Sequence, residues 1–357
     1  MRSTSGHHFV ALDHLRALAA LLVFSWHFLH YKSGYPVPFA QAPALFPLAI
    51  FDEGHVGVAL FMTLSGYLFA KLLAGKKIAY GQFLWNRVLR LAPLLVAVIL
   101  INLAMLLAQG APVTEFMVSV LRGAIYPSLP NGGWSITIEL HFYVLLPLLL
   151  ALITRSPWHA LAILALATTL RAAIYLMQGS VQHEAYFTLA GRIDQFTLGI
   201  LAYRMGLGQR MGNKTIFVVG TCFLLFYAWF DAHGGFMRSP GYPSPQPLWI
   251  VMSSIEGAAC ACLIAWYDGR RWSFLDGSAS QWVGKVGEYS YSVYLLHMFV
   301  VFDLAAFAHE RIMDISNFYV GLAWAFMCFV AFLPVAAASY HFIEKPFFAW
   351  RRPYTVQ

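Results

Sequence analysis

The stretch Asp13-His-Leu-Arg16-Ala-Leu-Ala-Ala-Leu-Leu-Val-Phe-Ser-Trp-His27 puts an arginine and a histidine inside a run that is otherwise typical of a membrane helix. In a helix, Arg16 and His27 lie three turns plus roughly 20° apart, so both side chains face the same way, with a rise of roughly 16 Å between them. Charge in hydrocarbon is costly and usually marks a pathway or a site. The alternative is an arginine that snorkels to the inner surface and a histidine that bonds to a neighbouring helix.

The composition is that of a polytopic membrane protein. The chain has 357 residues, of which 60% are hydrophobic and 11% are charged, whereas about 25% of residues are charged in a soluble domain. We therefore predict an all-α protein that forms a single integral-membrane domain over residues 1–357. About ten apolar segments are long enough to span a bilayer: 9–31, 56–73, 91–108, 136–153, 158–178, 187–205, 215–231, 248–267, 288–307 and 318–341.

The basic residues indicate the orientation of these segments. Sixteen lysines and arginines fall on the side of the predicted spans that holds the N-terminus, and four fall on the other side. Because cytoplasmic loops carry the excess of lysine and arginine, we predict that both termini are cytoplasmic. The net charge of +7 then reflects contact with the lipid bilayer, and we expect no nucleic-acid partner. The cysteines and histidines do not stand at metal-ligand spacing, so no metal site is predicted.

Two further arginines precede the third apolar segment. Arg87 and Arg90 are one helical turn apart, so their guanidinium groups project together and repel each other unless an anion lies between them. Phosphate suits this position because arginine binds it through two parallel hydrogen bonds. Binding of lipid headgroups is the alternative. On the first helix, Asp13 is expected to pair with Arg16 at i,i+3 spacing.

The sequence Gly133-Trp-Ser-Ile-Thr-Ile-Glu139-Leu-His-Phe-Tyr143 begins a predicted helix at the outer interface. Ser135 is expected to cap this helix and shares one face with Glu139 and Tyr143 at i,i+4 spacing. Glu139 is then near the depth of His27. A buried carboxylate beside a buried histidine predicts an acid–base pair.

The sixth apolar segment offers a structural role for buried charge. Arg192 and Asp194 are two residues apart, so they point to different helices and predict cross-links between them. An ion pair of Glu139 with Arg171 or Arg192 is the alternative to its acid–base role.

Other polar features leave two interpretations open. Tyr294 and His297 lie on one helical face in mid-membrane, where they either line a tunnel or bond across helices. Ser65, next to a glycine in the second segment, is a weak signal of the same kind. Two outer loops, 35–47 and 239–247, are proline-rich. They either cover an outward-facing cavity or serve only as connectors.

Taken in order along nearly the whole chain, these motifs resemble the integral-membrane acyltransferase 3 family, multi-span O-acyltransferases that modify bacterial surface sugars. The most specific are Arg-x10-His from Arg16 to His27, Arg-x-x-Arg at 87–90 and Gly-Trp-Ser-x-x-x-Glu at 133–139. Ser-Gly-Tyr-Leu at 65–68, Tyr-Ser-x-Tyr-x-x-His at 291–297 and the Glu-Lys-Pro-Phe that follows the last segment are also similar to the family. Some members append an extracellular hydrolase-like domain, which we do not expect here.

The resemblance implies transfer of an acyl group, with acetyl expected, from cytoplasmic acyl-CoA to a hydroxyl of an extracytoplasmic glycan or lipid-linked glycan. Acetyl-CoA is then a co-substrate, and no tightly bound cofactor is expected. Arg16, Arg87 and Arg90 would hold the CoA phosphates, His27 would act as general base, and Glu139 would orient His27 or stabilise its imidazolium. The supporting or tunnel-lining residues are Asp13, Ser65, Trp134, Ser135, Tyr143, Tyr294 and His297.

Several alternatives stay open at this point. Transfer is either direct or passes through an acyl-enzyme on His27 or a tyrosine. The acceptor is O-antigen, exopolysaccharide or another glycan of the bacterial inner membrane or cell surface, and the oligomeric state is not determined. A transporter or flippase of a sugar or lipid-linked sugar would share the many spans and buried charges. It does not need an arginine pair in line with a buried histidine.

Overall fold

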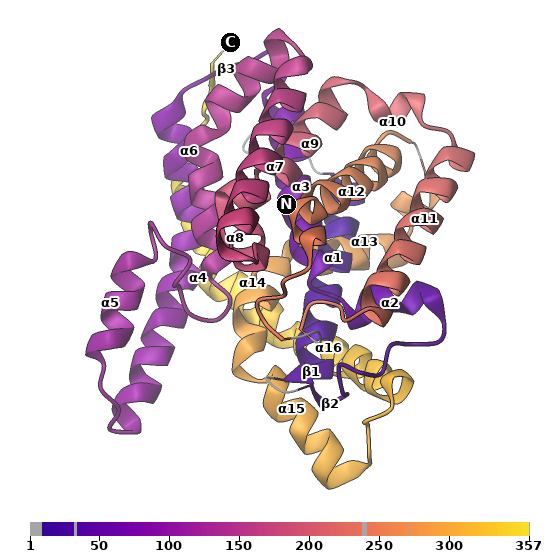
Figure 1. Cartoon of the computed structure of the whole chain (residues 1–357). Coiled ribbons are helices and arrows are strands. Elements are labelled where there is room, and N and C mark those ends of the chain that lie inside the picture. The colour runs from indigo at the N-terminus through magenta and orange to yellow at the C-terminus, as the bar shows by residue number, and fades with distance from the viewer. Residues whose placement is uncertain (1–8, 32–33, 238–240, 271, 357) are drawn as a thin grey trace.

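The structure is a computed structural model that describes residues 9–31, 34–237, 241–270 and 272–356. Within these ranges the chain forms α-helices joined by short loops and two small strand pairs (Figure 1). Seven helical runs are long and apolar enough to cross a membrane: α1 (Val10–Leu29), α3 (Val56–Leu73), α4 (Tyr80–Ala108), α6 (Trp134–Arg155), α7 (Trp158–Gln178), α11 (Asn213–Ala232), and α16 (Phe318–Ser339) with its helical extension to Trp350. The chain is therefore an all-α polytopic membrane protein.

The three other predicted segments are also helical but differ from simple spans. Segment 288–307 is broken, because α14 (Ser290–Leu296) and α15 (Val301–Phe307) belong to a pair of helical runs that meet at 58°. Counting that pair as one span gives eight. The helices α9 (Leu189–Arg204) and α12 (Met252–Asp268) have only 16 and 17 residues.

The remaining elements connect these helices. The short helices are α2 (Ala49–Asp52), α5 (Thr114–Arg122), α8 (Gln182–Phe187), α10 (Leu207–Arg210) and α13 (Ser278–Glu288). The antiparallel strand pairs are β1 (His30–Tyr31) with β2 (Tyr35–Pro36), and β3 (Lys77–Ile78) with β4 (Thr355–Val356). The C-terminus and β3 lie at one end of the helix bundle, and β1 and β2 lie toward the opposite end (Figure 1). Four basic residues of the orientation count, Arg2, Lys32, Arg238 and Arg271, lie outside the described residues.

Helix α3 is at the centre of the bundle. Its apolar window is 83% buried, whereas that of α4 is 17% buried and is left to face lipid. Two glycines let α3 and α9 touch through their backbones, as small residues do between membrane helices. A Cβ atom on Gly66 would lie 2.1 Å from the carbonyl oxygen of Phe196, and one on Gly199 would lie 2.1 Å from that of Thr63.

Replacing Gly66 with alanine is expected to destabilise the fold by about 1–3 kcal/mol, because the new methyl group overlaps backbone that has no room to move. Gly220→Ala is the matched control, since it also lies within a helix and its added Cβ would meet nothing within 4 Å. Thermal unfolding of the two variants in the same detergent measures the difference. Equal melting temperatures would contradict the close α3–α9 contact.

The predicted cross-links from the sixth segment are confirmed. Asp194 pairs with Arg171 of α7 at 2.6 Å, and Arg192 lies 3.6 Å from the carboxylate of Glu256 on α12. Both arginines are about 1% exposed. Because these two arginines already have carboxylate partners, a structural ion pair of either with Glu139 does not form.

Candidate functional site

The predicted site residues other than Asp13 line two neighbouring cavities. We call the first the arginine cavity; it lies among α1, α3, α4, α6 and α14, and its walls include Arg16, Ser65, Phe69, Arg87, Arg90, Ser135, Glu139, Tyr143, Tyr291 and Tyr294. We call the second the histidine cavity; its walls include Trp26, His27, His55, Trp134, Tyr186, Phe187, Phe236, Tyr242, Tyr294 and His297. Val58 and Tyr294 line both. The two cavities therefore adjoin across these two side chains.

The three predicted phosphate-binding arginines share the arginine cavity but differ in their partners. Arg16 donates to Asp13 at 2.6 Å, as its spacing predicted. Arg90 pairs with Glu344, a fully buried carboxylate that also accepts a hydrogen bond from Ser292. Each of these two arginines is thus neutralised by a carboxylate within the protein.

Arg87 has no such carboxylate partner among the described residues. Its guanidinium lies against the rings of Phe69, Phe83 and Tyr143, with centroids 5.2, 5.4 and 5.9 Å away. Its buried Nε has no hydrogen-bond partner in the described part of the chain. Helix α4 begins at Tyr80 rather than near residue 91, so Arg87 lies within the helix and not in a preceding loop. The arrangement leaves Arg87 free to bind an anion in the cavity.

Glu139 belongs to the arginine cavity and does not contact His27. Tyr143 donates a hydrogen bond to its carboxylate, which confirms their shared face, and the Ser65 hydroxyl lies 3.4 Å away. Ser135 lines the same cavity but does not cap the helix: α6 begins at Trp134 with Gly133 as the N-cap residue. The predicted pairing of Glu139 with His27 is not formed because the two side chains line different cavities.

The neighbours of His27 determine which of its ring nitrogens carries a proton. Its Nδ1 lies 2.9 Å from the carbonyl oxygen of Val23, which can only accept, so Nδ1 carries hydrogen and donates. His297 donates in the same way from its Nδ1 to the carbonyl of Val293, 3.0 Å away. The Nε2 of neutral His297 is then an acceptor, 3.2 Å from Nδ1 of His27. His27 thus keeps an unprotonated Nε2 without a partner among the described residues, as a general base requires.

Tyr294 lines both cavities and bonds to the residue that precedes the Gly-Trp-Ser motif. Its hydroxyl donates to the carbonyl of Gly132 at 2.9 Å. Its ring centroid is 6.2 Å from that of His297, so the predicted common face of these two residues is confirmed. Trp134 of the motif lines the histidine cavity, and its ring packs against that of Tyr186 with 5.0 Å between the centroids.

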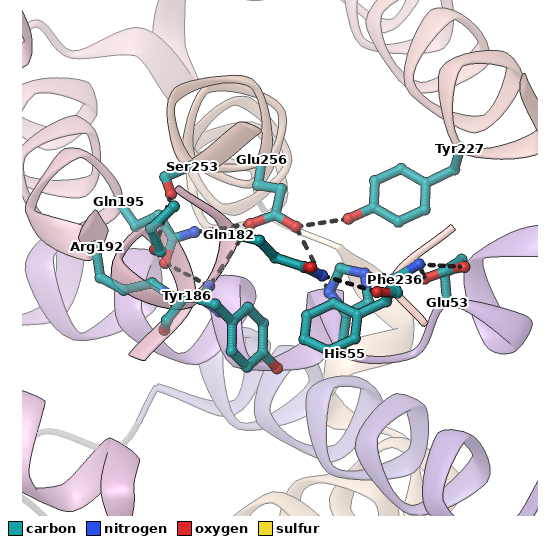
Figure 2. Close-up of polar contacts among 11 residues, drawn as sticks. Glu53, His55, Gln182, Tyr186, Arg192, Gln195, Tyr227, Phe236, Ser253 and Glu256 are labelled. Carbon is teal, nitrogen blue, oxygen red and sulfur yellow. Dashed lines mark hydrogen bonds and ion pairs between the residues drawn. The ribbon is translucent and has the colours of Figure 1, made fainter. Parts of the chain in front are cut away.

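Figure 2 shows a buried polar network that the sequence analysis missed. His55, Tyr186 and Phe236 of this network line the histidine cavity. The ring of His55 lies between two carboxylates, with Nε2 3.0 Å from Glu53 and Nδ1 3.8 Å from Glu256. Glu256 also accepts hydrogen bonds from Tyr227 at 2.7 Å and Gln195 at 2.9 Å. Glu256 could have been recognised from the sequence as a carboxylate within an apolar segment. No local spacing linked it to His55.

The same network anchors the loop that follows α11. The backbone N–H of Phe236 donates to Glu53 at 3.0 Å, and its carbonyl accepts from Gln182 at 2.7 Å. Gln182 also accepts from the backbone of Ser244 at 2.5 Å. Phe236 and Tyr242 of this loop line the histidine cavity. The proline-rich segment therefore contributes to a cavity wall and is more than a connector.

A family model described as an acyltransferase domain matches residues 9–341, nearly the whole chain. The matched range contains every predicted site residue, from Asp13 to His297. No curated protein and no solved structure matches the chain.

Proposed function

The chain belongs to the acyltransferase domain family whose model covers residues 9–341, and we propose that it moves an acyl group from cytoplasmic acyl-CoA to a hydroxyl on the opposite side of the membrane. Acetyl is the proposed acyl group, and an extracytoplasmic glycan or lipid-linked glycan, such as O-antigen or exopolysaccharide, is the proposed acceptor. The proposed location is the bacterial inner membrane, with about ten spans and both termini cytoplasmic. Family membership favours this activity over a transporter or flippase.

The observation that carries the proposal is the adjacency of the two cavities. Arginines suit the phosphates of CoA, and a histidine with an unprotonated Nε2 suits an acceptor hydroxyl. Val58 and Tyr294 line both cavities, so a thin pantetheine arm would pass these two side chains to reach the second cavity from the first. The rise of roughly 16 Å from Arg16 to His27 along one helix is about half of a bilayer core. Phosphates at one end would then leave the thioester near His27.

In the proposed reaction, the acceptor oxygen attacks the thioester carbonyl while Nε2 of His27 takes the hydroxyl proton. The new C–O bond forms, the C–S bond breaks, and the departing thiolate receives the proton from His27. Val23 and His297 hold the ring through Nδ1, which is the role that we had expected of Glu139. Glu139, bonded to Tyr143, instead contributes its negative charge to the arginine cavity.

The proposed function is tested by mass spectrometry of surface glycans from cells with and without the chain. An acyltransferase adds one acyl mass to a glycan, and purified protein releases CoA from acetyl-CoA when that glycan is supplied. A flippase changes the amount of glycan outside without an acyl mass shift. That second outcome would overturn the proposal.

Replacing both Arg87 and Arg90 with alanine is expected to raise the KM for acetyl-CoA by about 100-fold or more, because two charged hydrogen bonds to phosphate are lost and each contributes about 1.5–3 kcal/mol. The matched control removes two exposed arginines, Arg155→Ala with Arg210→Ala, and loses the same charge. Steady-state kinetics in nanodiscs measures both. An unchanged KM in the first variant would remove these residues from the donor site.

A further inference from the structure

The C-terminal segment is held against the start of α4, beside the arginine pair. Strand β4 pairs with β3 directly before α4, with Lys77 opposite Val356. The Asn86 side chain donates to the carbonyl of Arg352 at 2.7 Å and accepts from its N–H at 3.1 Å. Figure 1 shows β3 next to the C-terminus. These contacts fix the position of the adjacent residue, Arg351, relative to Arg87 and Arg90.

Arg351 and Arg90 share an aromatic surface. The guanidinium of Arg351 stacks on Phe348 with 3.6 Å to the ring centroid, and that of Arg90 lies 5.8 Å from the same centroid. In Arg351, Nε and Nη2 are buried and have no hydrogen-bond partner among the described residues. Nε of Arg87 is also buried and has no hydrogen-bond partner among the described residues. Buried N–H groups of charged side chains are costly when unpaired, so three donors in one region point to a ligand that accepts hydrogen bonds.

The charge balance identifies the sign of that ligand. Among the described residues, Glu344 is the one carboxylate that pairs with any of these three arginines, and it pairs with Arg90. Arg87 and Arg351 therefore have no ion-pair partner among the described residues, and the carboxylate that lines the arginine cavity, Glu139, is bonded to Tyr143. Burial, and then repulsion by Arg90 and Arg87, lower the pKa of Arg351. An anion would relieve this repulsion.

We propose that Arg351 and Arg87 form a phosphate-binding site, with Arg90 beside them, in which Arg351 binds a phosphate group of the acyl donor. The identification of that phosphate as part of an acyl donor rests on the proposed function. A free nucleotide phosphate and a lipid headgroup phosphate share the chemistry that the site recognises. The matched family range ends at residue 341, so the assignment of Arg351 depends on the structure and not on the family.

The test measures CoA binding by calorimetry on the full chain in nanodiscs of zwitterionic lipid. Arg351→Gln is expected to weaken CoA binding by about 10-fold. Arg352→Gln is the matched control, because it removes the same charge from an exposed neighbour whose contacts with Asn86 use only backbone atoms. Arg351→Lys keeps the charge without the planar fork and should bind with intermediate affinity. If Arg351→Gln fails to fold, Arg351→Lys takes its place in the test. CoA binding by Arg351→Lys equal to that of the wild-type chain would then overturn the proposal.

Two further arms identify the phosphate and its source. If Arg351 binds the 3′-phosphate, its substitution has no effect on binding of 3′-dephospho-CoA; if it binds the diphosphate, the loss is the same for both ligands. Wild-type affinity of Arg351→Gln for CoA would overturn the proposal while leaving the proposed function intact. A wild-type chain that does not bind CoA but retains phosphatidylglycerol through Arg351 would overturn the proposed function and assign the site to a lipid.

Discussion

Replacing His27 with glutamine is expected to reduce acyl transfer by about 10²- to 10⁴-fold, which is the usual contribution of a general base. Glutamine keeps much of the volume of the side chain but cannot take a proton. Binding of acetyl-CoA should persist, because the proposed phosphate ligands lie in the arginine cavity, whereas His27 lines the histidine cavity. Single-turnover transfer and donor affinity, measured on the same preparation, separate the two effects.

The matched control is His233→Gln. His233 makes the same type of i−4 bond as His27, from Nδ1 to the carbonyl of Trp229 at 2.8 Å, but is exposed. Its substitution should leave transfer unchanged. Full activity in His27→Gln would exclude His27 as the base, and loss of donor binding would give it a structural role. A labelled acyl-enzyme trapped with donor alone would replace direct transfer with a relay.

Replacing Arg171 with leucine is expected to destabilise the protein by about 3–5 kcal/mol, because it leaves the fully buried Asp194 carboxylate without its ionic partner. Arg171 also donates to the carbonyls of Ile250 and Gly191, at 2.7 and 3.0 Å, so it joins α7 to the start of α9 and to the turn before α12. Denaturant unfolding in detergent, followed by tryptophan fluorescence, measures the loss.

A double variant isolates the cost of the unpaired charge. Arg171→Leu with Asp194→Leu removes both ions, and exchange of a buried pair for apolar side chains is often close to neutral. The double variant should therefore recover part of the stability that the single variant loses. Arg155→Leu, an exposed substitution, should have little effect. A double variant no more stable than Arg171→Leu would mean that the lost hydrogen bonds to backbone, and not the unpaired Asp194 carboxylate, cause the destabilisation.

Sequence spacing predicted the contacts that a single helix determines. Asp13 with Arg16, and Glu139 with Tyr143, are one turn apart, so helical geometry alone brings them together. The divergence of Arg192 and Asp194 followed from their separation by two residues. The break between Phe299 and Val301 was not predicted, because hydropathy does not distinguish a bent pair of short helices from one continuous span.

Contacts between helices were harder to predict because several of these helices are apolar on most of their faces, and no polar stripe shows which side turns inward. Glu139 and His27 were placed at one depth, yet they line separate cavities. His297 is 270 residues from His27 in the chain, and no spacing rule connects them. Glu53 and His55 lie two residues apart in the turn before α3, whereas Glu256 lies on α12, about 200 residues later in the chain, and only the folded structure brings it to His55.

The sequence by itself determined that this protein is a helical membrane protein, that charged residues such as Arg192 and Asp194 lie within its spans, and which family it resembles. Hydrophobicity and helical period are local properties, and they suffice for these conclusions. Only the tertiary structure decided that His297 and not Glu139 holds His27, and that Arg351 lies beside Arg90. The first depends on how α1 packs against α14, and the second on the pairing of β4 with β3 and on the bonds between Asn86 and Arg352.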